Sequence, residues 1–357
     1  MNELWIKEAY HDALPESFHG GVKWQSPSNI ALVKYWGKQH GAQLPQNPSV
    51  SFTLSNCRTE TSIFFEKSDR FSLHFRFDGK ENTEFQDKIK AFLESNRTYF
   101  PFLDQIDLHI NSRNTFPHSS GIASSASSMS ALVMCLLDIE RMAKNEKDID
   151  LRKASFFSRL ASGSACRSVL PKMALWGVTE AVPESSDLFA VPLKDQIAPI
   201  FKSYHDSILI VSDAKKAVSS RVGHALMDTN PYAETRYAMA RKNTAELLSA
   251  LHSGDLEKAI PIIEAEALQL HALMMCSEPS FILIKPNTLR IIDALYEFRK
   301  ETEIPVCFTL DAGPNVHILY PDQHAEMVER FIMDELERYC VDGQWIADQV
   351  GDGPSKC

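Results

Sequence analysis

From residue 71 to residue 77, apolar and polar side chains alternate strictly, a period of two that fits a half-buried β-strand. The apolar positions are Phe71, Leu73, Phe75 and Phe77. One face of this strand is therefore buried and the other is wet. We expect the strand to pair with residues 61–66 through a turn-like segment at 67–69.

The remaining periodicity alternates between strands and helices, which predicts an α+β fold. The further expected strands are 106–110, 207–212, 304–310 and 316–320. The expected helices are 85–93, an apolar helix ending near residue 143, 233–252, 256–275 and 287–300. A final helix would carry Met327, Val328, Phe331, Ile332 and Leu336 on one face. A polar stretch between Pro192 and Pro199 predicts a boundary near residue 195, hence two domains, 1–195 and 196–357.

Charge and composition argue against several classes of function. The formal net charge of -10 disfavours general binding to nucleic acid, which needs an excess of Lys and Arg. No apolar run reaches the roughly 20 residues that span a bilayer, and residues 1–20 lack the apolar core of a signal peptide. We therefore expect a cytoplasmic protein that does not bind membranes. The seven cysteines form no CxxC pair, so we expect reduced thiols.

The segment PHSSGIASSAS at 117–127 predicts an anion site. Gly121 permits close approach of the backbone, the small residues leave room for a bulky anion, and the next helix presents unpaired N–H groups at its N-terminus. A Ser-rich helix cap would have the same composition. No Walker-type P-loop and no GxGxxG fingerprint occur, so the chain does not bind a nucleotide through a P-loop, and a Rossmann domain is not expected.

A lysine interrupts the apolar segment SPSNIALVKYWGK at 26–38. If residues 29–35 form a strand, alternation places Lys34 on the same face as Leu32 and opposite Asn29. Such a lysine is either an edge residue whose amine reaches water, or a functional cation that pairs with an anion.

Three other polar segments each have a functional and a structural interpretation. In SGSACRS at 162–168, hydroxyls surround Arg167, which suits a bound carboxylate or phosphate but also a solvated turn and helix cap. The basic run at 215–221 is either a solvated face or a response to a highly anionic substrate. In TLDAGPN at 309–315, Asp311 is either a turn former or a base aimed into a cleft.

Taken together and in this order, the segments resemble the GHMP kinase superfamily. The loop is similar to the phosphate-binding pattern of that superfamily at Pro117, Gly121, Ile122, Ser124, Ser125 and Ala126. Within the superfamily, the combination of NIALVKYWGK, SGSACRS and DAGPN resembles the diphosphomevalonate decarboxylases. This resemblance extends over roughly residues 24–320.

The resemblance implies a GHMP kinase fold, with an N-terminal ribosomal-protein-S5-like domain, a C-terminal ferredoxin-like domain and the active site between them. It also implies ATP and Mg²⁺ as cofactors, mevalonate 5-diphosphate as substrate, and a homodimer. In this family ATP phosphorylates the tertiary 3-hydroxyl, after which phosphate and CO₂ leave to give isopentenyl diphosphate and ADP.

The resemblance also assigns roles to individual positions. Asp311 would act near the 3-hydroxyl as base or orienting carboxylate, and Lys34 would neutralise charge on the transferring phosphoryl group. Arg167 and Asn29 would hold the substrate carboxylate. The residues implied for the diphosphate are Tyr35, Lys38, Ser162, Ser164, Ser220 and Arg221. Those implied for ATP are Pro117, Ser120, Gly121, Ala123, Ser124 and Ser125, with Ser124 or Ser125 also binding Mg²⁺.

Two alternatives are compatible with the same motifs. A related enzyme would decarboxylate mevalonate 5-phosphate or stop after phosphorylating the 3-hydroxyl, and a catalytically silent nucleotide-binding protein would use the same fold. The presence of both Asp311 and Lys34 favours decarboxylation, and Lys38 with Arg221 favours a diphosphate substrate. The chain departs from the usual family sequence at His118, Pro48 and Pro171.

Overall fold

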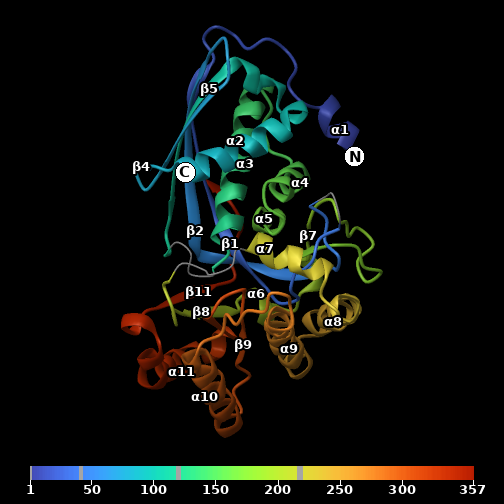
Figure 1. The fold of residues 1–357 in the computed structure, drawn as a ribbon, viewed down its shortest axis with the longest axis vertical. Helices are drawn as coiled ribbons and strands as arrows, with labels where there is room; N and C mark the ends of the chain where they lie inside the picture. The colour runs from blue at the N-terminus through green and yellow to red at the C-terminus, as the bar shows by residue number, and fades with distance from the viewer. Residues whose placement is uncertain (1, 40–42, 118–121, 215–219) are drawn as a thin grey trace.

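A computed structural model of the chain describes residues 2–39, 43–117, 122–214 and 220–357. Two β-sheets organise these residues, a large one in the upper part of Figure 1 and a small one in the lower part. The predicted α+β class is confirmed. In the described ranges, no helix is both long enough and apolar enough to cross a membrane. All seven cysteines are free thiols, as predicted.

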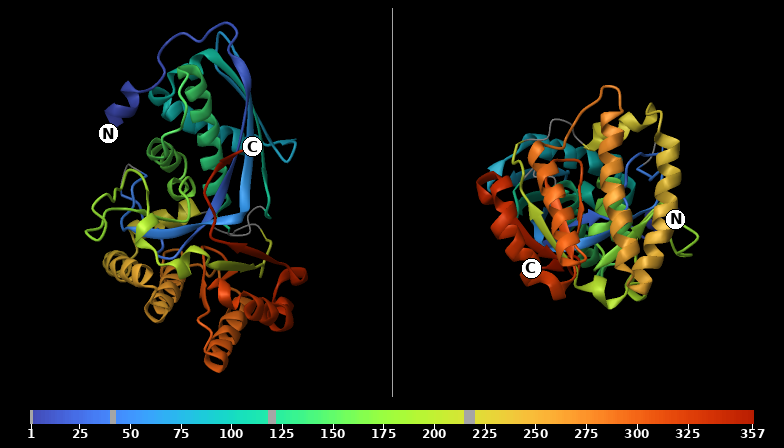
Figure 2. Two further views of the ribbon diagram at one scale, coloured as in Figure 1. Left: turned by 180° about the vertical axis from the view of Figure 1, so that it is seen from behind. Right: turned by 90° about the horizontal axis from the view of Figure 1, so that it is seen from below.

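The large sheet, as far as the structure describes it, has the strand order β12-β1-β2-β5-β3-β4, with β6 paired to β2 and β7 paired to β6. Its strands are β1 (His19–Ala31), β2 (Ser49–Lys67), β3 (Ser72–Phe77), β4 (Lys80–Glu81), β5 (Ile106–Asn114), β6 (Met173–Trp176), β7 (Val191–Pro192) and β12 (Ser355–Lys356). Figures 1 and 2 show the helices of this half on one side of the sheet. They are α2 (Thr83–Ser95), α3 (Ser124–Lys144), α4 (Leu151–Ala161) and α5 (Ala165–Ser168), while α1 (Asn2–Lys7) lies near the N-terminus.

The apolar face of the large sheet forms the first core. Phe52, Phe65 and Leu108 are fully buried there, and α3 packs against β1 and β2 with Leu136 and Ile139 equally buried. The opposite face of β3 and β5 carries polar side chains, as the alternation at 71–77 predicts. At β3 and β5 the sheet therefore has one covered face and one wet face, whereas the lower parts of β1 and β2 are buried on both faces.

The predicted hairpin between residues 61–66 and 71–77 is wrong. Strand β3 lies parallel to β5, with Leu73 opposite Leu108 and Phe75 opposite Ile110, and β5 separates β3 from β2. Helix α2 makes the crossover between β3 and β5, because a parallel pair cannot be joined by a tight turn. Alternation identifies the buried face of a strand but does not identify the neighbouring strand.

The small sheet is antiparallel, in the order β11-β8-β10-β9. Its strands are β8 (His205–Leu209), β9 (Cys307–Thr309), β10 (Val316–Tyr320) and β11 (Trp345–Gln349). The helices of this half are α6 (Pro199–Lys202), α7 (Ser220–Ala225), α8 (Ala233–Ser253), α9 (Leu256–Met275), α10 (Pro286–Thr302) and α11 (Ala325–Phe331), the last continuing as a π-helical turn at Ile332–Leu336. The predictions at 233–252, 256–275 and 287–300 are thus confirmed. In the last helix Val328, Ile332 and Leu336 are buried, but Met327 is 53% exposed, so the predicted apolar face is narrower than expected.

The end of the chain connects the two sheets. After β11 in the small sheet, the chain returns to the large one, where β12 pairs with β1. At the junction, β2 bulges: Pro27 of β1 pairs with Arg58, but Asn29 pairs with Thr53. The buried carboxylate of Asp348 in β11 accepts the N–H groups that the bulge leaves without strand partners. These donors are Ser55 (2.7 Å), Asn56 (2.8 Å) and Cys57 (2.7 Å). The domain boundary near residue 195 stays a prediction.

We expect Asp348→Asn to lower the free energy of unfolding by about 3 kcal/mol, since an N–H bond to a buried charged group contributes about 1.5–3 kcal/mol. The amide group of asparagine would place a donor against the Cys57 N–H, which already needs an acceptor. Chemical denaturation of both proteins measures the difference. Asp352→Asn is the matched control, because Asp352 is 83% exposed in its pair with Lys172 and should change stability little. Equal stability of the two variants would contradict this role of Asp348.

Candidate active site

A cavity of about 210 Å³ lies where the two halves of the chain meet. Segments near both sheets line it, since Ala31 ends β1 in the large sheet and Asp311 follows β9 in the small one. The predicted site residues that line it are Asn29, Lys34, Tyr35, Lys38, Ala123, Ser125, Ser162, Ser164, Arg167 and Asp311. The structure therefore brings most of the predicted residues into one cavity.

The position of Lys34 differs from the sequence prediction. Strand β1 ends at Ala31, and the next two N–H groups, of Leu32 and Val33, both donate to the carbonyl of Val50 (2.8 and 3.2 Å). This irregular pairing ends the alternation. Lys34 consequently lines the same cavity as Asn29, and the predicted placement of the two on opposite faces is wrong.

The amine of Lys34 is buried and paired. Its side chain is only 2% exposed, and Nζ lies 3.2 Å from Oδ1 of Asp311 and 2.6 Å from the carbonyl of Ala31. Burial lowers the pKa of Lys34, and the neighbouring Asp311 carboxylate opposes that shift. Lys34 is therefore not an edge lysine whose amine reaches water; its charge is available inside the cavity.

Asp311 is held by its backbone, which leaves its carboxylate directed into the cavity. The carbonyl of Asp311 accepts the Gly313 N–H (2.7 Å) and the Nε2–H of His271 (3.1 Å). Farther along the turn, Asn315 accepts the Ser212 N–H through its side chain (2.9 Å) and so fixes the loop to the end of β8. The Asp311 side chain is 23% exposed, so it contacts Lys34 and still faces the cavity.

Arg167 is a second buried cation in the cavity. Its Nε and Nη2 donate to Oδ1 of Asn29 (3.3 and 3.2 Å), and Nη1 donates to the hydroxyl of Ser49. The Asn29 amide is oriented for this by its own bonds to Ser168 Oγ (2.8 Å) and the Ser164 carbonyl (3.2 Å). Burial lowers the pKa of Arg167. Among the described residues no carboxylate forms an ion pair with this guanidinium, which suits it to an anionic ligand.

The serine-rich loop borders the cavity where it enters α3. Ala123 adopts a left-handed conformation (φ 43°) just before the helix, and Ser125 Oγ lies 3.2 Å from Ser162 Oγ at the end of α4. Ala123 and Ser125 line the cavity, whereas Pro117 and Ser124 are not among its lining residues. Ser120 and Gly121, and the departure at His118, lie outside the described residues, as do the side chains of Ser220 and Arg221. The proposed contacts of these residues stay predictions.

Sequence reasoning missed the buried network behind Lys34. The carboxylate of Glu266 in α9 accepts the backbone N–H of Lys34 (2.8 Å) and the amide of Asn243 (2.7 Å). It also pairs with both terminal nitrogens of Arg236 (2.7 and 2.5 Å), and Arg236 in turn reaches the carbonyl of Lys34 (3.3 Å). Two glutamates, Glu264 and Glu266, in the mostly apolar segment at 259–274 of α9 are a sequence signal that could have indicated buried charges.

Two histidines beside the cavity were also missed. The ring of His224 lies 4.4 Å from that of Tyr35 and 4.7 Å from that of Trp36, and its Nδ1 accepts the Gly37 N–H (3.0 Å). Burial lowers the pKa of His224 to about 3 and that of His271 to about 4. Both rings are therefore neutral at neutral pH.

We expect Glu266→Gln to destabilise the protein by about 3–5 kcal/mol, because Arg236 would be left as a buried charge without its partner. Denaturant titration measures the loss. Glu246→Gln provides the control, since Glu246 forms an exposed i,i+4 pair with Lys242 and should contribute little. A loss no larger than that of the control would show that the network does not depend on the Glu266 charge.

The neutral histidines predict acid sensitivity. Below about pH 6.5 the histidines of the unfolded chain are protonated, whereas His224 and His271 in the native state stay neutral. The contribution of these two residues to stability is therefore complete above about pH 6.5. It is lost as the pH falls toward 4 for His271 and toward 3 for His224. Over the range in which only the unfolded chain is protonated, each of the two histidines should lower the free energy of unfolding by about 1.4 kcal/mol for every pH unit of acidification. The slope of stability against pH, measured between pH 6.5 and 5, should decrease by that amount in His224→Gln. In the control His252→Gln, which alters an exposed histidine, the slope should not change.

Comparisons with known proteins show which family the chain is similar to. A family model described as the diphosphomevalonate decarboxylase-like N-terminal domain matches residues 26–188, and the mevalonate 5-diphosphate decarboxylase C-terminal domain matches residues 207–354. The diphosphomevalonate decarboxylase of Ganoderma lucidum is 31% identical over 330 residues, which are 86% of this chain and 80% of that protein.

Solved structures confirm the predicted GHMP kinase fold. The mevalonate diphosphate decarboxylase of Staphylococcus aureus superposes with a TM-score of 0.81 at 26% identity, covering 95% of this chain and 98% of the other. A complex of a protein called MDDEF with MVAPP, AMPPCP and magnesium superposes with a TM-score of 0.79 at 28% identity, covering 95% and 99% of the two chains.

Proposed function

Because this chain belongs to the diphosphomevalonate decarboxylase family, we propose that it converts mevalonate 5-diphosphate and ATP to isopentenyl diphosphate, ADP, phosphate and CO₂. The observation that carries the proposal is the 3.2 Å pair between Lys34 and Asp311, in a cavity that also contains the buried guanidinium of Arg167. This site offers a carboxylate for a hydroxyl group and two cations for anionic groups.

The first step uses the Lys34–Asp311 pair. Asp311 accepts or orients the proton of the 3-hydroxyl as its oxygen attacks the γ-phosphorus of ATP, and the bond from that phosphorus to the ADP oxygen breaks. The Lys34 ammonium lies beside the same carboxylate, where it can neutralise charge on the transferring phosphoryl group. The step converts hydroxide, a poor leaving group, into phosphate.

The second step breaks two bonds at the carbon skeleton. The 3-phosphate leaves with the electrons of its C–O bond, and the electron pair of the C–carboxylate bond forms the new double bond as CO₂ departs. Positive charge develops at the tertiary carbon, and Asp311 can stabilise it as a carboxylate once any proton that it accepted from the hydroxyl has passed to the phosphate group. We assign the substrate carboxylate to Arg167 and Asn29, whose mutual bonds at 3.2 and 3.3 Å preorganise them.

The diphosphate is assigned to the other polar groups of the cavity, together with Ser220 and Arg221. Lys38 lies at the cavity, where its Nζ donates to Gln43 (2.6 Å), and Ser162 is bonded to Ser125. Tyr35 packs beside Gly163, where a Cβ atom would come within 2.8 Å of the Tyr35 hydroxyl. The proposed diphosphate contacts are Tyr35, Lys38, Ser162, Ser164, Ser220 and Arg221.

ATP and Mg²⁺ are assigned to the N-terminus of α3. The left-handed Ala123 before the helix and the Ser125 hydroxyl at the cavity fit an anion held by backbone N–H groups. Mg²⁺ would supply charge neutralisation between phosphate oxygens, with Ser124 or Ser125 as its proposed protein ligand. The complex of MDDEF with MVAPP, AMPPCP and magnesium supports a nucleotide and Mg²⁺ as ligands of the protein, and the residues that would hold them stay a proposal. Homodimer formation and a cytoplasmic location stay predictions.

Parallel measurement of ADP and CO₂ tests the function. The purified chain should release both from ATP and mevalonate 5-diphosphate in equal amounts, and neither efficiently from mevalonate 5-phosphate. ADP without CO₂ would identify a 3-kinase, preference for the monophosphate would change the substrate assignment, and absence of both would indicate a catalytically silent protein.

Asp311→Asn should reduce the rate of CO₂ release by about 10²–10⁴-fold, because the amide can neither accept the hydroxyl proton nor stabilise a cationic carbon. Binding of ATP, measured by calorimetry, should survive, since ATP is assigned to the N-terminus of α3. Asp322→Asn is the control, as Asp322 is 67% exposed and pairs with His205 outside the cavity. Full activity of Asp311→Asn would refute the role given to this carboxylate.

A further inference from the structure

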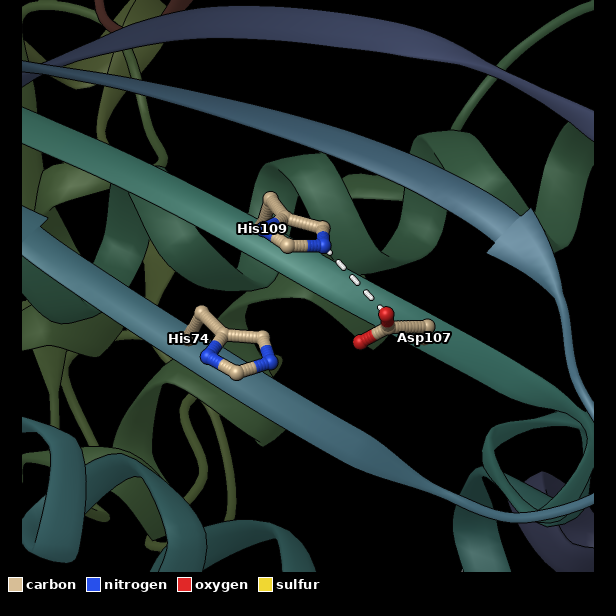
Figure 3. A group of neighbouring side chains, drawn as sticks. All are labelled: His74, Asp107 and His109. Carbon is tan, nitrogen blue, oxygen red and sulfur yellow. Dashed lines mark hydrogen bonds and ion pairs between the residues drawn. The ribbon is translucent and has the colours of Figure 1, made fainter.

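A second group of ligand-type side chains lies on the wet face of the large sheet, outside the catalytic cavity. It consists of His74 on β3 with Asp107 and His109 on β5 (Figure 3). Helices cover the opposite face of these strands, so the three side chains point toward solvent. The proposed decarboxylation uses none of them.

The parallel register of β3 and β5 determines how these residues meet. His74 lies directly opposite His109, and Ser72 directly opposite Asp107. The two imidazole rings are stacked, with centroids 4.7 Å apart and planes 15° from parallel, and His109 Nε2 lies 3.3 Å from a carboxylate oxygen of Asp107. One potential ligand atom from each residue lies within 4.8 Å of the others.

Asp107 is held in place by hydrogen bonds at both of its carboxylate oxygens. The hydroxyl of Ser72 donates to its Oδ1, which leaves Oδ2 directed toward His109. A carboxylate oriented by a hydroxyl group resembles the ligands of metal sites, whose orientation depends on such outer partners.

We propose that His74, Asp107 and His109 form a surface site for one divalent transition-metal ion of the Zn²⁺ class, joining β3 to β5. Two imidazoles and one carboxylate are ligands that Zn²⁺ binds at about 2.0–2.2 Å, and atoms that share one ion at such lengths lie at most about 4 Å apart. The three ligand atoms already lie within 4.8 Å of one another, so binding an ion would require only that the side chains close the small remaining difference. Two nitrogen ligands disfavour Mg²⁺, which prefers oxygen, so this site differs in chemistry from the assigned ATP site.

The location of the site indicates what the ion would do. Strand β3 lies near the edge of the sheet, with only the two-residue strand β4 beyond it. An ion bound to both strands would add a cross-link to the parallel pair β3–β5. Because the ligands come together only in the folded sheet, binding would stabilise the native state.

Titration of the full-length chain with Co²⁺ and Zn²⁺, without nucleotide, tests the proposal. The exposed thiols Cys276 and Cys357 are first replaced in Cys276→Ser/Cys357→Ser, because thiolates also bind these ions. We expect one Co²⁺ per chain, with a visible d–d spectrum and no thiolate charge-transfer band, and displacement of Co²⁺ by Zn²⁺. Zn²⁺ should also raise the Tm.

Substitutions locate the ion. In the same background, His74→Gln and His109→Gln should each weaken Zn²⁺ binding at least about 10-fold, and Ser72→Ala by about 10–100-fold through loss of Asp107 orientation. The matched control His252→Gln, on an exposed histidine of α8, should bind as the parent does. Binding that is absent up to about 1 mM Zn²⁺, or that survives His74→Gln and His109→Gln, would overturn the proposal and leave the group as a solvated His–Asp pair.

Discussion

Burial of two cations in one cavity is the constraint on which this structure depends. Lys34 and Arg167 are each 2% exposed, and a buried charge is tolerated only with partners. For Lys34 the partner is Asp311, 277 residues away in the sequence. The ion pair can form only when the end of β1 and the turn after β9 meet, so the electrostatics of the site requires both halves of the chain to be packed together. Glu266 and Arg236 reinforce this from behind by holding the Lys34 backbone.

The local charge of the cavity is opposite to that of the whole molecule. The chain has a formal net charge of -10, yet its cavity contains Lys34, Arg167 and Lys38, with Asp311 as its acidic lining residue among those described. The distant acidic surface is screened by salt, whereas the groups in the cavity act at hydrogen-bond distance. A substrate with a carboxylate and a diphosphate matches this excess of positive charge, and binding it removes the cost of holding Arg167 with neutral partners only.

Sequence patterns predicted local features well and long-range ones poorly. Hydrophobic periodicity located the long helices α8, α9 and α10, and the motif at 309–315 pointed to Asp311. The pairing of β3 with β5 was missed, because the period of a strand says which face is buried and nothing about its neighbour. The predicted face of Lys34 was wrong because the N–H groups of Leu32 and Val33 share one carbonyl of β2, an irregular pairing that the sequence of β1 does not show. Glu266 and His271 were overlooked for a similar reason: their partners come from other elements.

The return of β12 to the large sheet has a consequence for biosynthesis. Gln25 of β1 and Ser355 of β12 are bonded although 330 residues separate them, so the ribosome produces one side of this pair long before the other. Until β12 has been synthesised, the backbone groups at the outer edge of β1, near Trp24 and Gln25, lack their strand partner. An exposed strand edge of this kind can pair with another nascent chain. Protection of that edge during translation, by a chaperone or by fast folding of the second half, would then influence the yield of native protein.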